Sequence, residues 1–444
     1  MASTDILQYE TLPPLGNADL ATRAHRFARV LPLAFVTYSL AYLDRMNIQF
    51  GAAAGMKESL GFSDNQFALF NASFFWGYVL FQIPGTAYAA HRSCRKLIFW
   101  MLMCWGILAT MTGVLRDFRL LVADRILLGV VEGAVFPSLL VFLTHWFTRR
   151  ERSRANVLLI LGNPLTLFWA SGVSGLLLSF FNTHRLFGRE AWQLMFLAEG
   201  IPTLIWAVLW WFMAADYPSD VGWMDGSEAS GLQQIIDDEQ RHVVHVHNYR
   251  AAFADSRVWI FCFQFLAWSL GIYGLNSWLA LVIKNASGLS IRATGFLNMV
   301  PYLFGMLLML GVSFWSDRTL VRKAFVWPFM FLGAAAFGGS YLAGHNHFWW
   351  AFAGIVIACA CMYAPYGPFW AMVPEMVSRN VAGESMALIN TVGAVGGLVG
   401  TWGIGELNYA TKGPGAGFMC MGGSLVLAGI LTLLLHARKP TIAS

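Results

Sequence analysis

Two charged residues stand inside a long apolar stretch near the start of the chain. The segment AYLDRMNIQF, residues 41–50, contains Asp44 and Arg45, and no other Asp, Glu, Lys or Arg occurs between Val30 and Met56. This stretch exceeds the roughly 20 residues that a helix needs to cross a bilayer core. Ionisable side chains at the centre of such a helix cost about 2.5 kcal/mol or more and commonly mark the pathway of a substrate or a proton. Asp44 and Arg45 are therefore candidates for anion binding and proton transfer.

A second group of charges lies in the apolar segment 119–147, which contains Asp124, Arg125 and Glu132. Arg125 and Glu132 are seven residues apart, so on a helix they project from the same face about 10 Å apart. They are too far apart to touch, but side chains from the helix at 30–53 can lie between them. We expect Asp124 to be a solvated acid at the outer end of its helix.

These groups together suit the coupling of a proton to an anion. The carboxylates of Asp44 and Glu132 balance the charges of two arginines when both acids are ionised. Protonation of either acid leaves a net positive site, which attracts an anionic substrate. The alternative is a static network of buried ion pairs that holds the two helices together.

Several uncharged side chains in apolar segments can contribute to the same site. Amide and aromatic side chains can bond substrate hydroxyl groups or line a cavity, although each can equally bond or pack between helices. In RILLGVVEG, Gly129 and Gly133 have the spacing that lets helix backbones approach closely. The prolines of YAPYGPFWAMVP, residues 363–374, predict a bend or local unwinding. The polar and aromatic candidates are Tyr42, Tyr78, Gln82, Asn163, Tyr273, Trp370 and Asn390.

The composition identifies the elements that must position these residues. Of the 444 residues, 57% are hydrophobic and 12% are charged, whereas a soluble domain has about 25% charged residues. We therefore predict an all-α polytopic membrane protein with twelve transmembrane helices in two six-helix halves. The twelve apolar segments are 30–53, 65–90, 97–115, 119–147, 155–181, 192–214, 257–283, 293–315, 324–343, 347–373, 383–407 and 415–437.

A long polar stretch separates the sixth segment from the seventh. Within it, IIDDEQRHVVHVHNYR predicts a short amphipathic helix in a cytoplasmic linker. The spacing of His242, His245 and His247 can bind a metal, but we interpret this segment as a solvated linker. The predicted units are an N-terminal tail 1–29, a first half 30–214, the linker 215–256, a second half 257–437 and a C-terminal tail 438–444.

The distribution of basic residues predicts the orientation in the membrane. With the N-terminus inside, 19 of the 29 Lys and Arg residues fall in inside segments and eight in outside segments. Basic residues are more frequent in cytoplasmic loops, so both termini are predicted to be cytoplasmic. Residues 1–22 are polar and lack the pattern of a signal peptide, so we interpret 30–53 as a permanent helix.

The two halves contain a weak internal repeat. The loop GTAYAAHRSCRK after the second segment and the loop VSFWSDRTLVRK after the eighth both end in a basic pair. Their alignment places Asp317 and Arg318 opposite Ala90 and His91. Duplicated halves of six helices are typical of a transporter whose site lies between them, and Asp317 and Arg318 are candidates for its gate.

Three segments resemble the major facilitator superfamily, and within it the anion:cation symporter family. They are YLDRMNI, DRILLGVVEGAVFPSLLVFLTHWF and YGPFWAMVPEMVSRNVAGESMALINTVGAVGGLVG, and the resemblance extends over essentially the whole chain. It implies the major facilitator fold and proton-coupled uptake of organic anions by alternating access. The residue roles that it implies are proton coupling for Asp44 and Glu132, carboxylate binding for Arg45, support of the acids for Arg125, and a sugar-acid cavity lined by Tyr42, Tyr78, Asn163, Trp370 and Asn390.

The chain departs from the family pattern at three positions. Ala90 and Ser93 stand where the loop motif of the superfamily has Asp and Gly, which puts the latch of the first half in doubt. Asn163 stands where aldonate transporters of the family have Gln, and the shorter amide suggests a different substrate contact.

We predict a proton symporter of the cytoplasmic (inner) membrane that imports a sugar acid. An aldonate or ketoaldonate, such as 2-ketogluconate, is expected to bind Arg45 through its carboxylate and Asn163 and Asn390 through its hydroxyl groups. Trp370 is expected to form an apolar wall. An aromatic carboxylate, such as hydroxyphenylacetate or phthalate, is an alternative substrate, and sodium coupling and a membrane sensor on a transporter fold also stay open.

Other classes of function have no support in the sequence. We find no phosphate-cradling loop, no metal-ligand cluster and no nucleophile next to a plausible base, so we predict neither an enzyme nor a cofactor. The six cysteines lack the spacing of metal ligands or of disulfide pairs. The net charge of +5 resides in loops between apolar segments and does not indicate nucleic-acid binding. We expect a monomer whose partners are its substrate and the lipid bilayer.

Overall fold

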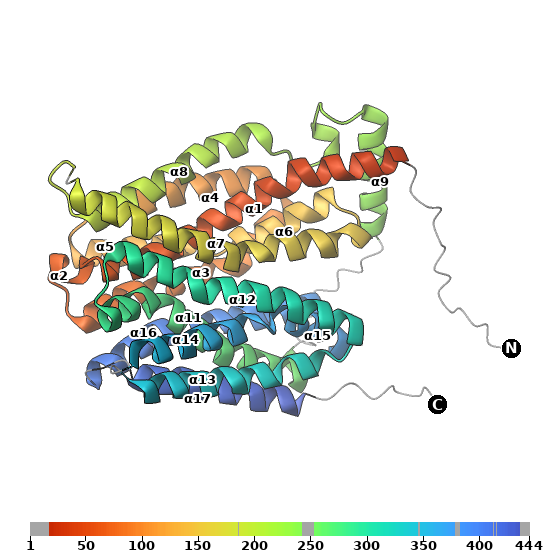
Figure 1. Cartoon of the computed structure of the whole chain (residues 1–444). Coiled ribbons are helices and arrows are strands. Elements are labelled where there is room, and N and C mark those ends of the chain that lie inside the picture. The colour runs from red at the N-terminus through yellow and green to blue at the C-terminus, as the bar shows by residue number, and fades with distance from the viewer. Residues whose placement is uncertain are drawn as a thin grey trace.

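The computed structural model describes residues 17–184, 186–241, 253–344, 347–377, 382–411, 413 and 415–435, and these form helices without a strand (Figure 1). The first half contains α1 (Asn17–Ala53), α2 (Met56–Leu60), α3 (Asp64–His91), α4 (Cys94–Thr112), α5 (Phe118–Glu132), α6 (Val135–Trp146), α7 (Arg149–Thr183) and α8 (Ala191–Met213). The 3₁₀ turn η1 (Pro218–Asp220) and α9 (Gly226–Arg241) follow. The second half contains α11 (Ser256–Ser287), α12 (Ile291–Thr319), η2 (Arg322–Phe325), α13 (Trp327–Ala343), α14 (Phe348–Tyr363), α15 (Tyr366–Met376), α16 (Ala382–Ala410) and α17 (Gly415–Leu434).

The prediction of an all-α membrane protein with twelve apolar helical segments is confirmed. Two of the segments are each divided into two helices, namely 119–147 into α5 and α6, and 347–373 into α14 and α15. The second division lies at Pro365, where the prolines predict it. Ten helical spans within the described residues are long and apolar enough to cross a membrane. The other two predicted segments lie in α1, which contains Asp44 and Arg45, and in α3.

Local sequence signals position the ends of these helices. Ser63 and Gln66 form a capping box at the start of α3, and the carboxylate of Asp117 accepts the backbone N–H groups of Arg119 and Leu120 at the start of α5. Such caps satisfy amide groups that a helix terminus leaves without partners. Gly288 ends α11 with φ of 65°, a conformation that suits glycine.

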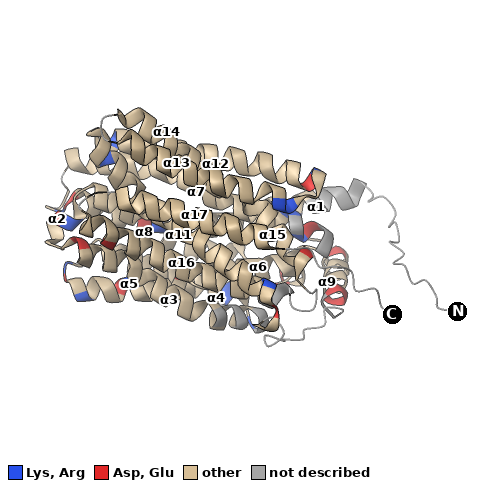
Figure 2. Cartoon of the chain, turned by 90° about the horizontal axis from the view of Figure 1, so that it is seen from below, with Lys and Arg blue, Asp and Glu red and all other residues tan. Residues whose placement is uncertain are grey.

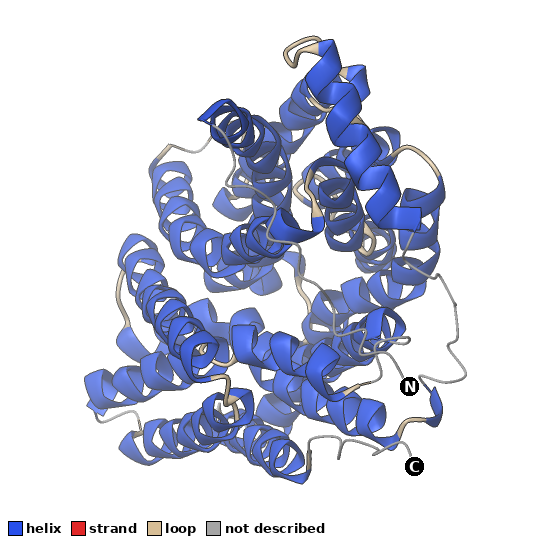
Figure 3. Ribbon diagram, turned by 90° about the vertical axis from the view of Figure 1, so that its right-hand side faces the viewer, coloured by secondary structure: helices blue, strands red, loops and turns tan. Residues whose placement is uncertain are grey.

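The helices pack as two halves that lie side by side along their length (Figure 1). Figure 3 views the same arrangement from the end that carries α9. Helices α1, α3 and α7 of the first half pack against α11, α16 and α12 of the second. The backbones of α7 and α12 approach closely, because a Cβ atom on Gly175 would lie only 2.8 Å from Cα of Gly295.

Contacts between the halves are found toward the end of the bundle that carries α2. The backbone N–H of Ala280 donates to Gln49 Oε1 at 3.2 Å, and Asn298 Nδ2 donates to Ser171 Oγ at 2.9 Å. The start of α1, the end of α17 and α9 lie at the opposite end (Figure 1). The halves are therefore joined near α2, on the side away from the two chain ends.

Charged residues gather at the two ends of the bundle, and few occur in the middle (Figure 2). Large apolar side chains such as Leu80, Phe212 and Trp350 are exposed on the outer surface. A bilayer needs such an uncharged belt, because charges in the hydrocarbon region are costly. The few charges in the middle of the bundle form the candidate site.

The linker differs in part from its prediction. Helix α9 begins at Gly226 and is described to Arg241, so it starts before the predicted segment IIDDEQRHVVHVHNYR. His242, His245 and His247 lie outside the described residues.

Candidate functional site

Two ion pairs join α1 to α5 in the middle of the first half. Arg45 Nε donates to Glu132 Oε2 at 3.1 Å, and Arg125 Nη1 lies 3.9 Å from Asp44 Oδ2. Asp44, Arg125 and Glu132 are buried. The structure thus brings together the four charges that the sequence singled out, with side chains of α1 reaching both Arg125 and Glu132.

The two ion pairs differ in their distances and in their hydrogen bonding. Arg45 and Glu132 share a hydrogen bond, whereas the Asp44 pair lies at the limit of ion-pair distance. Within the described part of the chain, Asp44 Oδ2, Glu132 Oε1 and two nitrogen atoms of Arg125 are buried without a hydrogen-bond partner. Buried polar groups usually have partners because desolvation is costly. The carboxylate oxygens can therefore bind a proton or accept further hydrogen bonds, and the Arg125 nitrogen atoms can donate to a bound molecule.

Aromatic rings surround the guanidinium group of Arg45. Its Cζ atom lies 4.9 Å from the ring centres of Tyr42 and Tyr78 and 5.4 Å from that of Phe74. Cations are attracted to the faces of such rings, and the attraction grows when water is excluded. The rings hold Arg45 in place while leaving 17% of its side chain exposed.

A cavity of about 50 Å³ lies beside Arg45, and both halves contribute to its wall. One water molecule takes about 30 Å³ of liquid volume, so the cavity is too small for a sugar acid. Binding of such a molecule requires the surrounding helices to move apart. The lining residues are Tyr42, Arg45, Met46, Ile48, Asn71, Phe74, Phe75, Arg125, Leu167, Tyr273, Asn276 and Ser277.

Four predicted substrate contacts are absent from the residues that line this cavity: Tyr78, whose ring lies beside Arg45, and the three residues described next. Asn163 is buried in α7, and its Oδ1 atom has no hydrogen-bond partner among the described residues. Trp370 of α15 packs against Phe265, with ring centres 5.2 Å apart. Asn390 is half-buried in α16. In this conformation these three residues and Arg45 do not share one cavity.

The two residues predicted to form the gate, Asp317 and Arg318, make separate contacts. Asp317 pairs with Arg322, and Arg322 Nε also lies 3.3 Å from Glu375 Oε1. The guanidinium group of Arg318 instead lies 4.2 Å from the ring centre of Phe314. Arg322 therefore joins α12 to α15, a role that the sequence analysis did not assign to it.

Gly129 and Gly133 allow α5 to approach α3 within the first half. A Cβ atom on Gly129 would lie 1.9 Å from the backbone oxygen of Phe74, and one on Gly133 would lie 2.5 Å from that of Tyr78. Both contacts are with the backbone that carries the rings around Arg45. The glycine spacing thus sets the distance between Glu132 and these rings.

We expect Gly129→Val to destabilise the protein, because the added side chain must push α5 away from α3. Overpacking of this kind costs about 1–3 kcal/mol. Gly311→Val on α12 is the matched control, since a Cβ atom there meets nothing within 4 Å. Thermal unfolding in detergent measures both variants. Equal melting temperatures for the two would show that the close approach of α5 to α3 does not matter.

The prediction for Asp124 is wrong, because this acid is buried. Thr112 of α4 donates to its carboxylate at 2.6 Å, and only 3% of the residue is exposed. Asp124 was predicted to be solvated because it lies near a helix end. The sequence does not show that the end of α4 covers this acid.

Glu199 is a further buried acid that was not predicted from the sequence. This buried acid of α8 accepts a hydrogen bond from Ser174 at 2.8 Å, and its second oxygen has no partner among the described residues. An acid inside the apolar segment 192–214 was the signal that could have identified it. Asn276 was missed as well, and it bonds Tyr302 and Tyr363 beside the cavity.

Comparison with known proteins decides the family. The sequence model of the Major Facilitator Superfamily matches residues 34–401. The chain belongs to this superfamily. A putative tartrate transporter of Agrobacterium vitis is 32% identical over 413 residues, which are 93% of this chain and 90% of the relative. The quinolone resistance transporter of Acinetobacter baumannii is 30% identical over 92% of this chain and 94% of its own length.

Solved structures agree on the fold of this transporter. The xylose transporter XylE of E. coli, in an inward-open conformation, has a TM-score of 0.74 at 14% identity and covers 94% of this chain and 98% of its own. A bacterial homologue of the lysosomal transporter Spinster, inward-facing and unoccupied, has a TM-score of 0.72 at 18% identity and covers 92% and 95%. These structures show the major facilitator fold, and the superfamily match together with the relatives named as transporters identifies the protein as a transporter and not an enzyme.

Proposed function

We propose that this transporter imports a small organic anion together with a proton, and that the anion is a sugar acid, an aldonate or ketoaldonate such as 2-ketogluconate. The observation that carries the proposal is Arg45, a partly exposed guanidinium group in the wall of the cavity between the halves. Arginine can bind a carboxylate through two parallel hydrogen bonds. Glu132 already accepts one hydrogen bond from this group, from Nε at 3.1 Å.

Competition for Arg45 supplies the coupling. A proton on Glu132 removes its negative charge and weakens its hold on Arg45 Nε, which frees the guanidinium group for the substrate carboxylate. Release of the proton restores the ion pair and displaces the substrate. Asp44, beside Arg125, is the second acid through which the charge of the network can change. A neutral network that gains one proton and one monovalent anion stays neutral, which favours transport of both together.

Support for a hydroxylated acid comes from the polar groups of the cavity and from relatives. Asn71, Asn276 and Ser277 line the cavity and can bond hydroxyl groups. Two relatives are named as putative tartrate transporters, and tartrate is a hydroxylated carboxylate. We propose that Asn163, Trp370 and Asn390 join this wall when the halves move.

The proposed location is the inner membrane, with both termini in the cytoplasm. The excess of Lys and Arg in the segments on the same side as the termini supports this orientation. The start of α1 and the end of α17 lie at one end of the bundle (Figure 1). In that orientation, the contacts between the halves close the outer side.

An aromatic carboxylate is the second candidate substrate. Rings of Tyr42, Phe74, Phe75 and Tyr273 line the cavity and can stack on an aromatic substrate. One relative is named as a quinolone resistance transporter, and quinolones are aromatic. Hydroxyphenylacetate and phthalate are the acids to compare with sugar acids.

Uptake into proteoliposomes under an imposed pH gradient tests the proposal. We expect labelled 2-ketogluconate or a related sugar acid to accumulate when the outside is more acidic than the inside, and an ionophore that collapses the gradient to stop accumulation. Replacing sodium by choline at fixed pH separates proton coupling from sodium coupling. Uptake that is unaffected by collapse of the gradient would contradict proton symport, and accumulation of aromatic acids alone would select the second candidate.

A further inference from the structure

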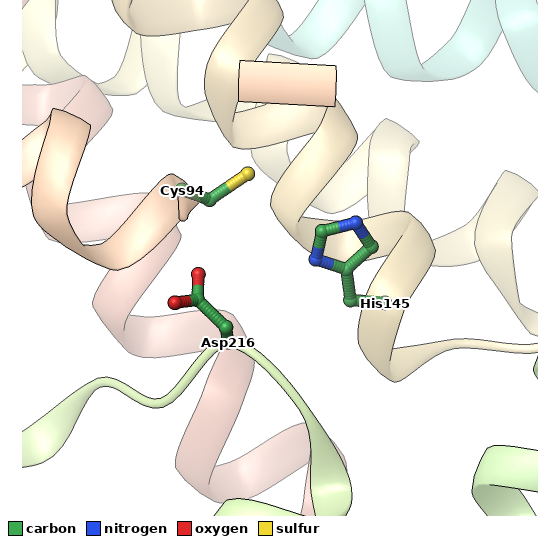
Figure 4. Close-up of side chains that lie close together, drawn as sticks. All are labelled: Cys94, His145 and Asp216. Carbon is green, nitrogen blue, oxygen red and sulfur yellow. The ribbon is translucent and has the colours of Figure 1, made fainter. Parts of the chain in front are cut away.

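Three side chains with metal-binding atoms meet at the end of the first half that carries α9. Cys94 begins α4, His145 lies in the last turn of α6, and Asp216 lies in the segment between α8 and η1. One ligand atom from each lies within 4.8 Å of the other two. Figure 4 shows the thiol, the imidazole ring and the carboxylate facing a common space. This group is separate from the charged centre around Arg45.

Burial and orientation distinguish this group from a chance meeting of polar side chains. His145 is 7% exposed. Its Nδ1 atom is buried and has no hydrogen-bond partner within the described part of the chain. In Figure 4 the ring faces Cys94 and Asp216. A buried ring nitrogen without a partner is costly, and a metal ion is one partner that satisfies it.

Neighbouring groups fix the orientation of two of the three side chains. Asp216 accepts hydrogen bonds from Ser93 Oγ at 2.5 Å and from the backbone N–H of Arg95 at 2.8 Å, one on each oxygen. The ring of His145 stacks on Tyr217, with ring centres 4.9 Å apart. Support of this kind around the ligands is typical of metal sites, because it holds them in the binding geometry.

We propose that Cys94, His145 and Asp216 bind one zinc ion. Zinc accepts sulfur, nitrogen and oxygen ligands in a tetrahedron, with bonds of about 2.3 Å to sulfur and 2.0–2.2 Å to nitrogen and oxygen. These bonds place the ligand atoms about 3.5 Å apart, so ligand atoms that lie up to 4.8 Å apart must approach by up to about 1.3 Å. Such a shift is within reach of side-chain rotation. A water molecule takes the fourth position.

The chemistry of the ligands favours zinc over harder cations. Calcium and magnesium bind oxygen ligands almost alone, whereas the thiol and imidazole here suit a borderline-soft ion. The thiol of Cys94, which points to the backbone oxygen of Ala89 at 3.4 Å, loses its proton to solvent when the metal binds. The thiolate and the carboxylate then balance the two positive charges of zinc, so the buried complex is neutral.

The bound ion would fasten three segments of one half to each other. Residues on α4, on α6 and after α8 would share one ligand sphere, so the metal stabilises the α9 end of the first half. Cys94 and His145 belong to the first half, and Asp216, at the start of the linker, is hydrogen-bonded to Ser93 and to the backbone of Arg95 in that half. Movement of one half relative to the other does not change their distances, so the site is structural and does not depend on which anion is transported.

Zinc binding by the full-length protein tests this inference. The affinity tag is removed, metals are stripped with a chelator, and zinc is added to protein in detergent. We expect about one zinc per chain by elemental analysis, together with a higher melting temperature. Cobalt in place of zinc should give the charge-transfer absorption of a metal–thiolate bond, which reports on the cysteine directly.

Single substitutions assign the ligands. Cys94→Ser and His145→Gln should weaken zinc binding at least about tenfold, and Cys94→Ser should remove the charge-transfer band. Asp216→Asn keeps one acceptor oxygen in place of two and should also weaken zinc binding. Cys104→Ser, which removes an exposed thiol from the same helix, is the matched control and should leave binding unchanged.

The three histidines of the linker are the competing source of a zinc signal. A variant with His242, His245 and His247 replaced by alanine should bind zinc as the wild type does. The inference is wrong if the stripped wild type binds no zinc. It is also wrong if zinc binds equally well to Cys94→Ser and His145→Gln, or if the linker variant loses the binding.

Discussion

Arg45→Ala should abolish substrate binding and uptake. Two arginines line the cavity, and the guanidinium group of Arg45 is the more exposed of the two; it lies next to Tyr42 and Tyr78 and is hydrogen-bonded to Glu132. Truncation of one partner of a buried charge pair costs about 2–5 kcal/mol. Since each 1.4 kcal/mol is a factor of ten in affinity, the dissociation constant should rise by at least about thirtyfold. Binding of the labelled acid that wild-type vesicles accumulate measures this change.

Arg45→Lys separates the charge from the geometry of the side chain. Lysine keeps the positive charge but lacks the planar fork that binds a carboxylate through two hydrogen bonds. We expect this variant to bind the acid more tightly than Arg45→Ala and more weakly than the wild type. An affinity equal to that of the wild type would mean that only the charge of Arg45 matters.

Arg292→Ala is the control for the loss of an arginine that contacts a ring. Arg292 begins α12 near the α2 end, and its guanidinium group lies 6.0 Å from the ring centre of Phe296. Arg292 does not line the cavity, so its replacement by alanine should leave substrate binding unchanged. If Arg45→Ala bound and accumulated substrate as this control does, Arg45 would be a structural residue of the ion-pair network.

Asp44→Asn should impair accumulation driven by a pH gradient more than exchange of substrate across the membrane. Asparagine has nearly the shape of aspartate and keeps an oxygen that can accept from Asn47 Nδ2. It cannot take up or release a proton, however. Exchange requires only that the transporter return across the membrane with substrate bound. Accumulation requires that Asp44 and Glu132 release their protons on the inner side of the membrane. We expect accumulation to fall at least about tenfold, with exchange reduced much less.

Two further acids show whether this effect is specific. Glu132→Gln should behave like Asp44→Asn, because Glu132 is the partner of Arg45. Asp124→Asn removes another buried acid that bonds Thr112 of α4 and not an arginine, and it should keep most of the accumulation. Both assays use the same proteoliposomes, loaded with unlabelled substrate for exchange and empty for accumulation. Normal accumulation in Asp44→Asn and in Glu132→Gln would mean that neither acid carries the proton.

The sequence predicted which charged residues lie in the membrane but did not predict which of them form ion pairs. The heptad spacing of Arg125 and Glu132 showed that both lie on one face of a helix, and the charges of residues 44 and 45 suggested a partner helix. The choice of partner depends on how α1 packs against α5, which the spacing does not contain. The structure assigns Asp44 to Arg125 and Arg45 to Glu132. Arg322 is a second example. The internal repeat showed only that it belongs to a basic pair, whereas the packing of α12 against α15 brings it to Glu375.

The number of apolar segments, most of their ends to within about six residues and the presence of charges in the membrane follow from the sequence by itself, whereas the start of α1 at Asn17 and the division of the segment 119–147 do not. These properties depend on the lengths of apolar runs and on helical periodicity, which are local features of the chain. The tertiary structure decided which distant residues meet. Thr112 covers Asp124, and the halves close the cavity beside Arg45. Cys94, His145 and Asp216, which lack any metal-binding spacing in the sequence, converge only because three segments end at the same place in the fold.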